Sequence, residues 1–207
     1  MNIAGVTRPD PPPVVTLFEL YGAGAADVGV RVAEALGLPF HAQAFSSEEL
    51  EDPSALEQNA VLATVLAVLG GAYRGLEGRD IVATQQQKHD LVAENNRVVR
   101  QLARSGGVIV GRNGAVVLAD RPNTLHVLLT GARQDRIERA ARQADISADR
   151  AARRLEREDD VRAEMSKALY GWDPRQPDRY DLVLDTSRIP PAGAAEAIVH
   201  ALRAVLR

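Results

Sequence analysis

Residues 14–29 read VVTLFELYGAGAADVG, an apolar run that leads into a glycine turn and then into residues with helical spacing. The run at 14–18 is rich in β-branched and apolar residues, which predicts a buried strand. From Val28 onward the apolar residues recur as they do on one face of a helix. The stretch therefore predicts a strand, a glycine turn and a helix in direct succession.

Further apolar runs without polar alternation predict strands buried on both faces, at 108–111, 124–130 and 182–186. A short extended run lies at 38–45, and helical patterns occupy 54–69, 80–104, 132–143, 147–169 and 191–206. Alternating strands and helices predict an α/β domain in which helices cover both faces of a parallel sheet of about five strands. Ligands of such sheets bind beyond the carboxyl ends of the strands, where the glycine turn lies.

Composition narrows the class of protein. The chain has 207 residues, a formal net charge of −3 and no cysteine. We expect a flexible leader at 1–13, which ends in three prolines, and a single domain at 14–207. No apolar stretch approaches the roughly 20 residues that span a bilayer, and no secretory start is visible, so we expect a cytoplasmic protein without a membrane partner. The acidic balance argues against a nucleic-acid partner.

The glycine turn is the first candidate site. Glycines between a buried strand and a helix let backbone N–H groups face an anion at the helix N-terminus. A phosphate loop normally adds a lysine and a Ser or Thr hydroxyl, and this turn has neither. Asp27 stands where the hydroxyl would lie, and its carboxylate could bind Mg²⁺ or repel a phosphate. Alternatively, Gly22 and Gly24 serve only to let the helix approach the strand.

Two arginine-bearing segments are further candidates. The segment VIVGRNG at 108–114 delivers Arg112 to the same sheet edge, where a guanidinium can hold a phosphate with two parallel hydrogen bonds. The alternative is a surface arginine beside an Asn-Gly turn. The stretch 131–164 is rich in arginine, and four of its arginines share one helical face: Arg150, Arg153, Arg154 and Arg157. The stretch has as many acidic residues as arginines, which favours a solvated helix with ion pairs. Only a few of its arginines would then reach a ligand.

These segments, in this order, resemble the cytidylate kinase-like family of the P-loop kinases. The resemblance rests on ELYGAGAADVG, on VIVGRNG followed by RPNTLHVLLT, on DRIERAARQADIS and on YGWDPRQPDRYDLVLDTSRI. It implies a three-layer P-loop kinase fold with a helical lid at about 145–170. It also implies transfer of a phosphoryl group from ATP to a nucleoside monophosphate, CMP or dCMP, with Mg²⁺ bridging the donor phosphates.

The resemblance also implies roles for particular residues. Arg112 would hold the acceptor's phosphate, and Arg133 or Arg136 would lie near the adenine. Three arginines would belong to the catalytic lid: Arg153, Arg157 and Arg162. The donor phosphates would lie on Gly22, Ala23, Gly24, Ala25, Ala26 and Asp27, with Asp27 as the candidate Mg²⁺ ligand.

The phosphate loop departs from the family pattern. Members typically read YGSGGREIG where this chain reads YGAGAADVG, so a hydroxyl is lost at Ala23, a flexible position at Ala25 and a cation at Ala26. A lost phosphate-binding cation can cost several orders of magnitude in rate, by analogy with arginine fingers worth about 10³–10⁵. Two hypotheses stay open: a nucleotide-binding protein with weak phosphotransferase activity, and an inactive regulatory or assembly subunit. The apolar segment 55–69 would bury against a second copy or another protein, or it is an ordinary core helix.

Overall fold

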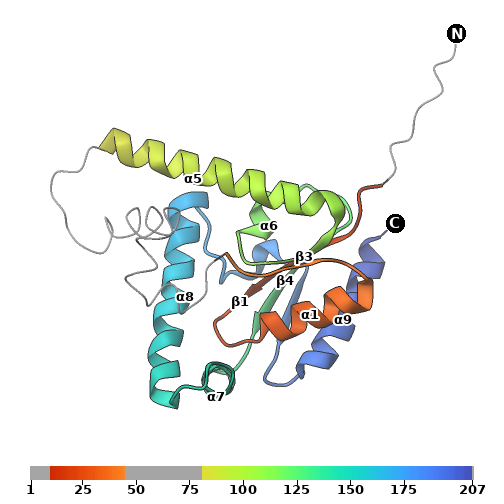
Figure 1. Ribbon diagram of the computed structural model, residues 1–207, viewed down its shortest axis with the longest axis vertical. Coiled ribbons are helices and arrows are strands. Elements are labelled where there is room, and N and C mark those ends of the chain that lie inside the picture. The colour runs from red at the N-terminus through yellow and green to blue at the C-terminus, as the bar shows by residue number, and fades with distance from the viewer. Residues whose placement is uncertain (1–9, 45–80, 207) are drawn as a thin grey trace, which may run out of the picture.

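The computed structural model describes residues 10–44 and 81–206, and its centre is a parallel sheet (Figure 1). The five strands lie in the order β2-β3-β1-β4-β5 and pair in parallel throughout. The strands are β1 (Val14–Glu19), β2 (Phe40–His41), β3 (Gly107–Val110), β4 (Thr124–Thr130) and β5 (Leu182–Asp185). The α/β architecture expected from the sequence is confirmed. The predicted apolar helix at 54–69, with the proposed oligomer surface 55–69, lies outside the described residues.

Helices cover both faces of the sheet. On one face α1 (Ala25–Leu36) packs against α9 (Pro191–Val205), and on the other lie α5 (Ile81–Leu102) and the short α6 (Gly114–Val117) (Figure 1). The helices α7 (Arg133–Ala144) and α8 (Ala148–Tyr170) pack on each other, and α8 also contacts α5. Two 3₁₀ helices complete the described elements, η1 (Ala103–Ser105) and η2 (Pro177–Arg179). Within the described ranges, no helix combines the length and apolar character that crossing a membrane requires.

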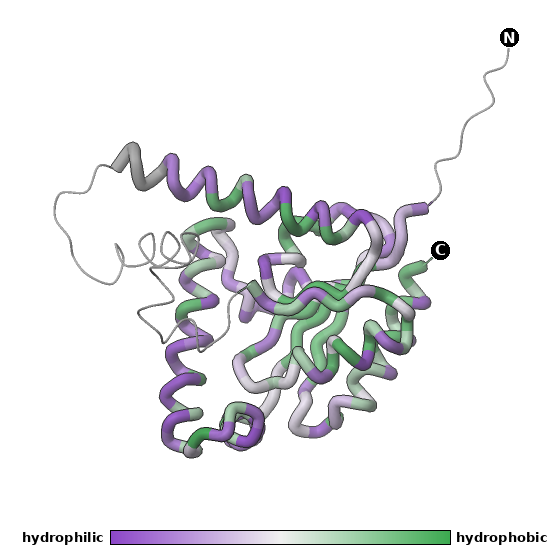
Figure 2. Tube along the Cα trace, in the orientation of Figure 1, coloured by the Kyte–Doolittle hydropathy of each residue, from purple (hydrophilic) through white to green (hydrophobic). Residues whose placement is uncertain are grey.

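The central strands are mostly apolar because each face of the sheet has its own core. The larger core joins the sheet to α1 and α9 through Leu17, Val127, Leu129, Val32 and Ile198, among others. The smaller core lies under α5 and α6 and contains Val14, Ile109, Val99, Ala103 and Leu118. Figure 2 shows this division, with hydrophobic strands at the centre and a mostly hydrophilic α8.

The last strand differs from its prediction. The run at 182–186 was expected to be buried on both faces, but β5 pairs only with β4 among the described strands and forms the edge of the sheet. Val183 is 44% exposed, whereas Leu184 is buried. An edge strand has one neighbour, so its outward side chains lack the cover that β1 and β4 receive.

The last residues of the expected leader are bound at the end of the sheet where the strands begin. The carbonyl oxygens of Pro11 and Pro12 accept hydrogen bonds from Asn123 and Arg121 side chains, at 2.9 and 2.6 Å. The carbonyl of Pro13 accepts one from Gly107 N. Residues 11–13 are therefore fixed to the segment between η1 and β4.

Candidate functional site

The glycine turn after β1 has the shape of a phosphate loop. Gly22 and Gly24 have φ of 80° and 92°, in the left-handed region that favours glycine. A Cβ at Gly22 would lie 2.4 Å from the carbonyl oxygen of Arg136, so no larger residue fits there. Gly24 is the N-cap residue that directly precedes α1. The predicted sequence of strand, glycine turn and helix is present, with the turn at the carboxyl end of the strand.

Carboxylates of the chain itself accept hydrogen bonds from this turn. Gly24 N and Ala25 N both donate to Oε2 of Glu19, at 2.8 and 2.9 Å. Tyr21 N donates to Oδ1 of Asp159 on α8, at 2.7 Å. The amides at the N-terminus of α1, which would face a phosphate, therefore face a negatively charged oxygen already.

Side chains from α7 and from the end of β5 hold the carbonyl groups of the same turn. Arg136 Nη1 donates to Tyr21 O at 3.1 Å, and Arg139 Nη1 donates to Gly22 O at 2.7 Å. Thr186 Oγ1 donates to Ala23 O at 2.8 Å. Arg136 also pairs with Asp159 Oδ2 at 2.8 Å. Three successive carbonyls of the turn are thus bound by side chains, which restrains its shape.

The aromatic ring of Tyr21 joins the turn to the helical lid. It lies in a cluster of buried apolar side chains from α7 and α8: Ile137, Ala140, Ala151 and Leu155. The guanidinium carbon of Arg162 lies 5.7 Å from the ring centroid, at cation–π distance. The helices α7 and α8, which include the expected lid, are therefore packed on the glycine turn.

Ala26 and Asp27 follow the glycines of the turn, and neither supplies a cation. Ala26 is exposed and has no charge to offer a phosphate. The Asp27 carboxylate accepts a hydrogen bond from Arg31 Nε at 2.7 Å on the outer surface of α1. This exposed ion pair occupies one carboxylate oxygen of Asp27, so the role of Asp27 as a ligand of Mg²⁺ stays a prediction. Among the residues that the structure describes, no group of three or more His, Asp or Glu is gathered for a metal.

The turn after β3 presents Arg112 in a constrained backbone. Gly111, Arg112 and Asn113 have successive positive φ values of 71°, 56° and 54°. Such a conformation costs energy for residues with a Cβ and persists where the surroundings hold it, often at functional sites. The carbonyl of Arg112 accepts a hydrogen bond from Asn95 Nδ2 at 2.9 Å. Asn95 Nδ2 also donates to the hydroxyl of Tyr170 at 2.6 Å, so α5 and α8 both brace the turn.

The guanidinium of Arg112 is incompletely satisfied. Its Nη2 donates to Ala42 O at 3.4 Å, and its buried Nε has no hydrogen-bond partner within the described part of the chain. Burial lowers the pKa of Arg112 from its ordinary value, although arginine stays protonated. Buried donors are normally paired, so this one is suited to an anionic ligand.

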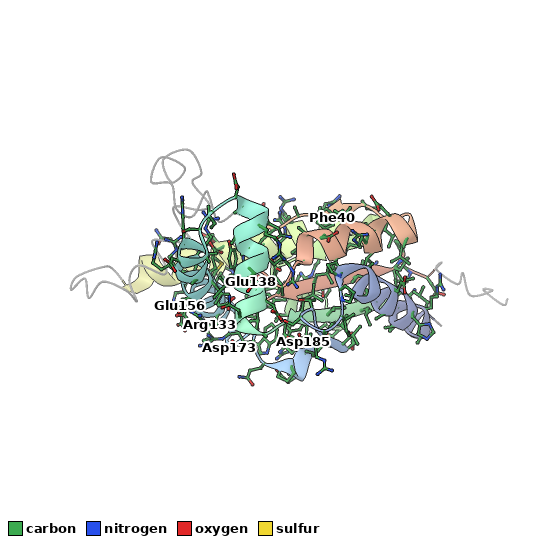
Figure 3. All side chains as sticks on the ribbon, turned by 90° about the horizontal axis from the view of Figure 1, so that it is seen from below. Phe40, Arg133, Glu138, Glu156, Asp173 and Asp185 are labelled. Atoms are coloured by element: carbon green, nitrogen blue, oxygen red, sulfur yellow. The ribbon has the colours of Figure 1, made fainter. Side chains whose placement is uncertain are left out.

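The arginines expected in the lid lie in different environments. Arg162 Nη2 is 3.1 Å from Oε2 of buried Glu158, an ion-pair contact without hydrogen-bond geometry. Arg153 and Arg157 are exposed, as is Arg150, whereas Arg154 is buried, so the four arginines predicted to share a face straddle the boundary with the core. Arg133 pairs with Glu156 on the surface, at 2.6 Å (Figure 3).

The structure thus brings Arg136 and Arg162 to the loop, with Arg112 on the turn after a neighbouring strand. Sequence reasoning missed four residues that hold the loop: Glu19, Arg139, Asp159 and Thr186. Arg139 follows Arg136 by three positions on α7, and Thr186 directly follows β5 at the carboxyl edge, which are signals that the sequence contains. For Glu19 and Asp159 the sequence contains no comparable signal, because Glu19 accepts hydrogen bonds from backbone amides and the partners of Asp159 lie on distant segments of the chain.

Comparisons with known proteins identify relatives of the whole arrangement. The model of the cytidylate kinase-like family matches residues 14–188. A cytidylate kinase of Methanopyrus kandleri is 29% identical over 185 residues, which cover 84% of this chain and 85% of that protein. A Corynebacterium glutamicum protein named uronate isomerase is 38% identical over 96 residues, which cover 46% of this chain but only 18% of that protein.

Solved structures agree with the fold. An uncharacterized protein from Eubacterium ventriosum matches with a TM-score of 0.66 and 15% identity, over 92% of this chain and 98% of that chain. A gluconokinase from Sinorhizobium meliloti matches with a TM-score of 0.51 and 18% identity, over 95% of each chain. At these identities the similarity shows a shared fold alone.

Proposed function

This chain belongs to the cytidylate kinase-like family, and we propose that it binds a nucleoside monophosphate, CMP or dCMP, and phosphorylates it slowly from ATP. The observation that carries the proposal is Arg112, whose buried Nε lacks a partner among the described residues at the carboxyl edge of the sheet. The Methanopyrus kandleri relative is named cytidylate kinase and is similar to this chain over most of its length, which supports the choice of nucleotide.

The geometry around Arg112 suits a phosphate monoester. A guanidinium can offer two parallel N–H groups to the oxygens of one phosphate, which fixes its orientation as well as its position. The left-handed backbone of residues 111–113 and the hydrogen bond from Asn95 hold the backbone that carries this side chain, and Nη2 of Arg112 itself donates to Ala42 O at 3.4 Å. A preorganised cation costs little to order on binding.

The residues that would surround the phosphates of ATP explain why the reaction would be slow. In the transfer an oxygen of the acceptor's phosphate bonds to the γ-phosphorus of ATP as the bond to ADP breaks, and cations stabilise the charge on the transferred group. Ala26 supplies no such cation, and Arg136 and Arg139 donate to backbone carbonyls of the loop. Mg²⁺ would enter with ATP as part of the substrate, and the Asp27 carboxylate would be its protein ligand after release from the exposed ion pair with Arg31.

Binding and turnover are tested separately. CMP should raise the melting temperature of the natural chain by mass action and should fail to do so for Arg112→Ala. Arg203→Ala, which removes an exposed arginine of α9, is the matched control and should respond like the natural chain. Equal stabilisation of Arg112→Ala would show that Arg112 does not hold the nucleotide.

A coupled assay with ATP, Mg²⁺ and a panel of nucleoside monophosphates tests transfer. Slow turnover with CMP or dCMP is expected, and turnover on none of the nucleotides would remove the enzymatic part of the proposal while leaving binding intact.

The second candidate function is that of an inactive family member which serves as a regulatory or assembly subunit. The observation that favours it is the pair of carboxylates, Glu19 and Asp159, that accept hydrogen bonds from the loop amides. Binding of CMP without any turnover would support this function. A solution mass that corresponds only to a monomer would count against self-assembly through residues 55–69.

A further inference from the structure

We propose that Glu19 is an internal anion of the phosphate loop, and that its carboxylate competes with the phosphates of the donor nucleotide for the amides at the start of α1. This inference rests on the proposed function, because it concerns the loop that would bind ATP. One oxygen, Oε2, accepts hydrogen bonds from both Gly24 N and Ala25 N. A phosphate oxygen in the same place would use the same two donors.

The attraction between the Glu19 carboxylate and the amides at the start of α1 is electrostatic. The unpaired N–H groups and the dipole of a helix favour negative charge at its N-terminus, and they do not distinguish a carboxylate from a phosphate. Gly24 and Ala25 are buried, while Glu19 itself is half-buried. The two amides can therefore serve one anion at a time, and the half-buried carboxylate is the group able to leave.

The surroundings decide how the site would open. The backbone of Glu19 is fixed, since Glu19 pairs with Leu129 in the register of β1 and β4. The loop is fixed as well, because Arg136, Arg139 and Thr186 hold its carbonyls. A phosphate would therefore gain access by rotation of the Glu19 side chain, with no change in the loop. Asp159 holds Tyr21 N independently and would stay in place.

Competition by Glu19 should raise the apparent dissociation constant for ATP by a measurable factor. An apparent dissociation constant rises by the inverse of the fraction of molecules whose site is open. Two hydrogen bonds to a charged group favour the closed state by at least about a factor of ten. Removing the carboxylate should then tighten binding of ATP by about tenfold or more.

Calorimetric titration with ATP and Mg²⁺ tests this on four full-length proteins. Glu19→Ala should bind at least about tenfold more tightly than the natural chain, and Glu19→Gln, which keeps the shape without the charge, should lie between the two. Glu34→Ala is the control, since it removes an exposed carboxylate from α1 that is distant from the N-terminus of that helix. It should bind ATP as the natural chain does.

Inorganic phosphate gives a second reading that requires no nucleotide. Glu19→Ala should melt at a lower temperature than the natural chain because α1 loses its anion, and added phosphate should restore part of the loss. Added phosphate should change the melting temperatures of the natural chain and of Glu34→Ala only weakly. If Glu19→Ala does not fold, Glu19→Gln gives the same comparison.

Equal ATP affinity of the natural chain and both Glu19 variants, or no binding by any of them, would overturn the role of Glu19. The proposed function is judged independently, by the Arg112-dependent stabilisation with CMP.

Discussion

Removing the Asp159 carboxylate should destabilise the fold far more than removing a surface carboxylate from the same helix. Asp159 accepts hydrogen bonds from Arg136 Nη1 at 2.8 Å and from Tyr21 N at 2.7 Å. The side chains of Arg136 and Asp159 are only 9% and 15% exposed. In Asp159→Ala the guanidinium keeps the carbonyls of Tyr21 and Gly131 but loses its counter-charge, and Tyr21 N loses its partner.

The burial of this ion pair sets the magnitude of the expected loss. Removing one partner of such a pair costs about 3–5 kcal/mol, since the other charge stays buried. Because Arg136 retains two carbonyl acceptors, we expect the lower end, about 3 kcal/mol, for Asp159→Ala. Asp159→Asn keeps an oxygen for Tyr21 N and should lose less.

The control is Glu156→Ala. Glu156 pairs with Arg133 at 2.6 Å between the same two helices, but these side chains are 64% and 55% exposed. An exposed pair contributes about 1 kcal/mol or less, despite the shorter distance. The free energy of unfolding is measured with urea, by circular dichroism and by the fluorescence of Trp172, the single tryptophan. A loss below about 1 kcal/mol for Asp159→Ala, or one equal to that of Glu156→Ala, would refute the reasoning.

Three further predictions concern stability. Burial lowers the pKa of His126 below 6.5, so the unfolded chain takes up the proton first and the free energy of unfolding should fall as the pH drops below 6.5. His126→Asn should flatten this dependence, and an unchanged slope between about pH 7 and 5 would contradict it. Gly22→Ala should cost more than Gly37→Ala in urea unfolding, because a Cβ at Gly22 meets a carbonyl oxygen whereas one at Gly37 has nothing within 4 Å. Leu129→Ala should cost about 2–5 kcal/mol and Val183→Ala well under 1, by the same measurement, since only Leu129 is buried.

Local sequence patterns were sufficient to predict many of the strands and helices. The strands at 14–18, 108–111 and 124–130 and the helices at 132–143 and 147–169 lie within a residue or two of β1, β3, β4, α7 and α8. Periodicity and glycine turns are properties of neighbouring residues, so they can be read along the chain. The position of Arg112 follows in the same way, since it comes directly after a buried strand.

Partners distant in sequence could not be predicted in that way. Burial of β5 on one face alone depends on its place at the sheet edge, and the contact of Asp159 with Tyr21 spans 138 positions. The sequence by itself determined that a glycine turn joins a buried strand to a helix and that this turn has no lysine. Only the tertiary structure decided what the turn binds, because its amides and carbonyls are equivalent along the chain until folding brings Glu19, Arg139 and Asp159 to particular ones among them.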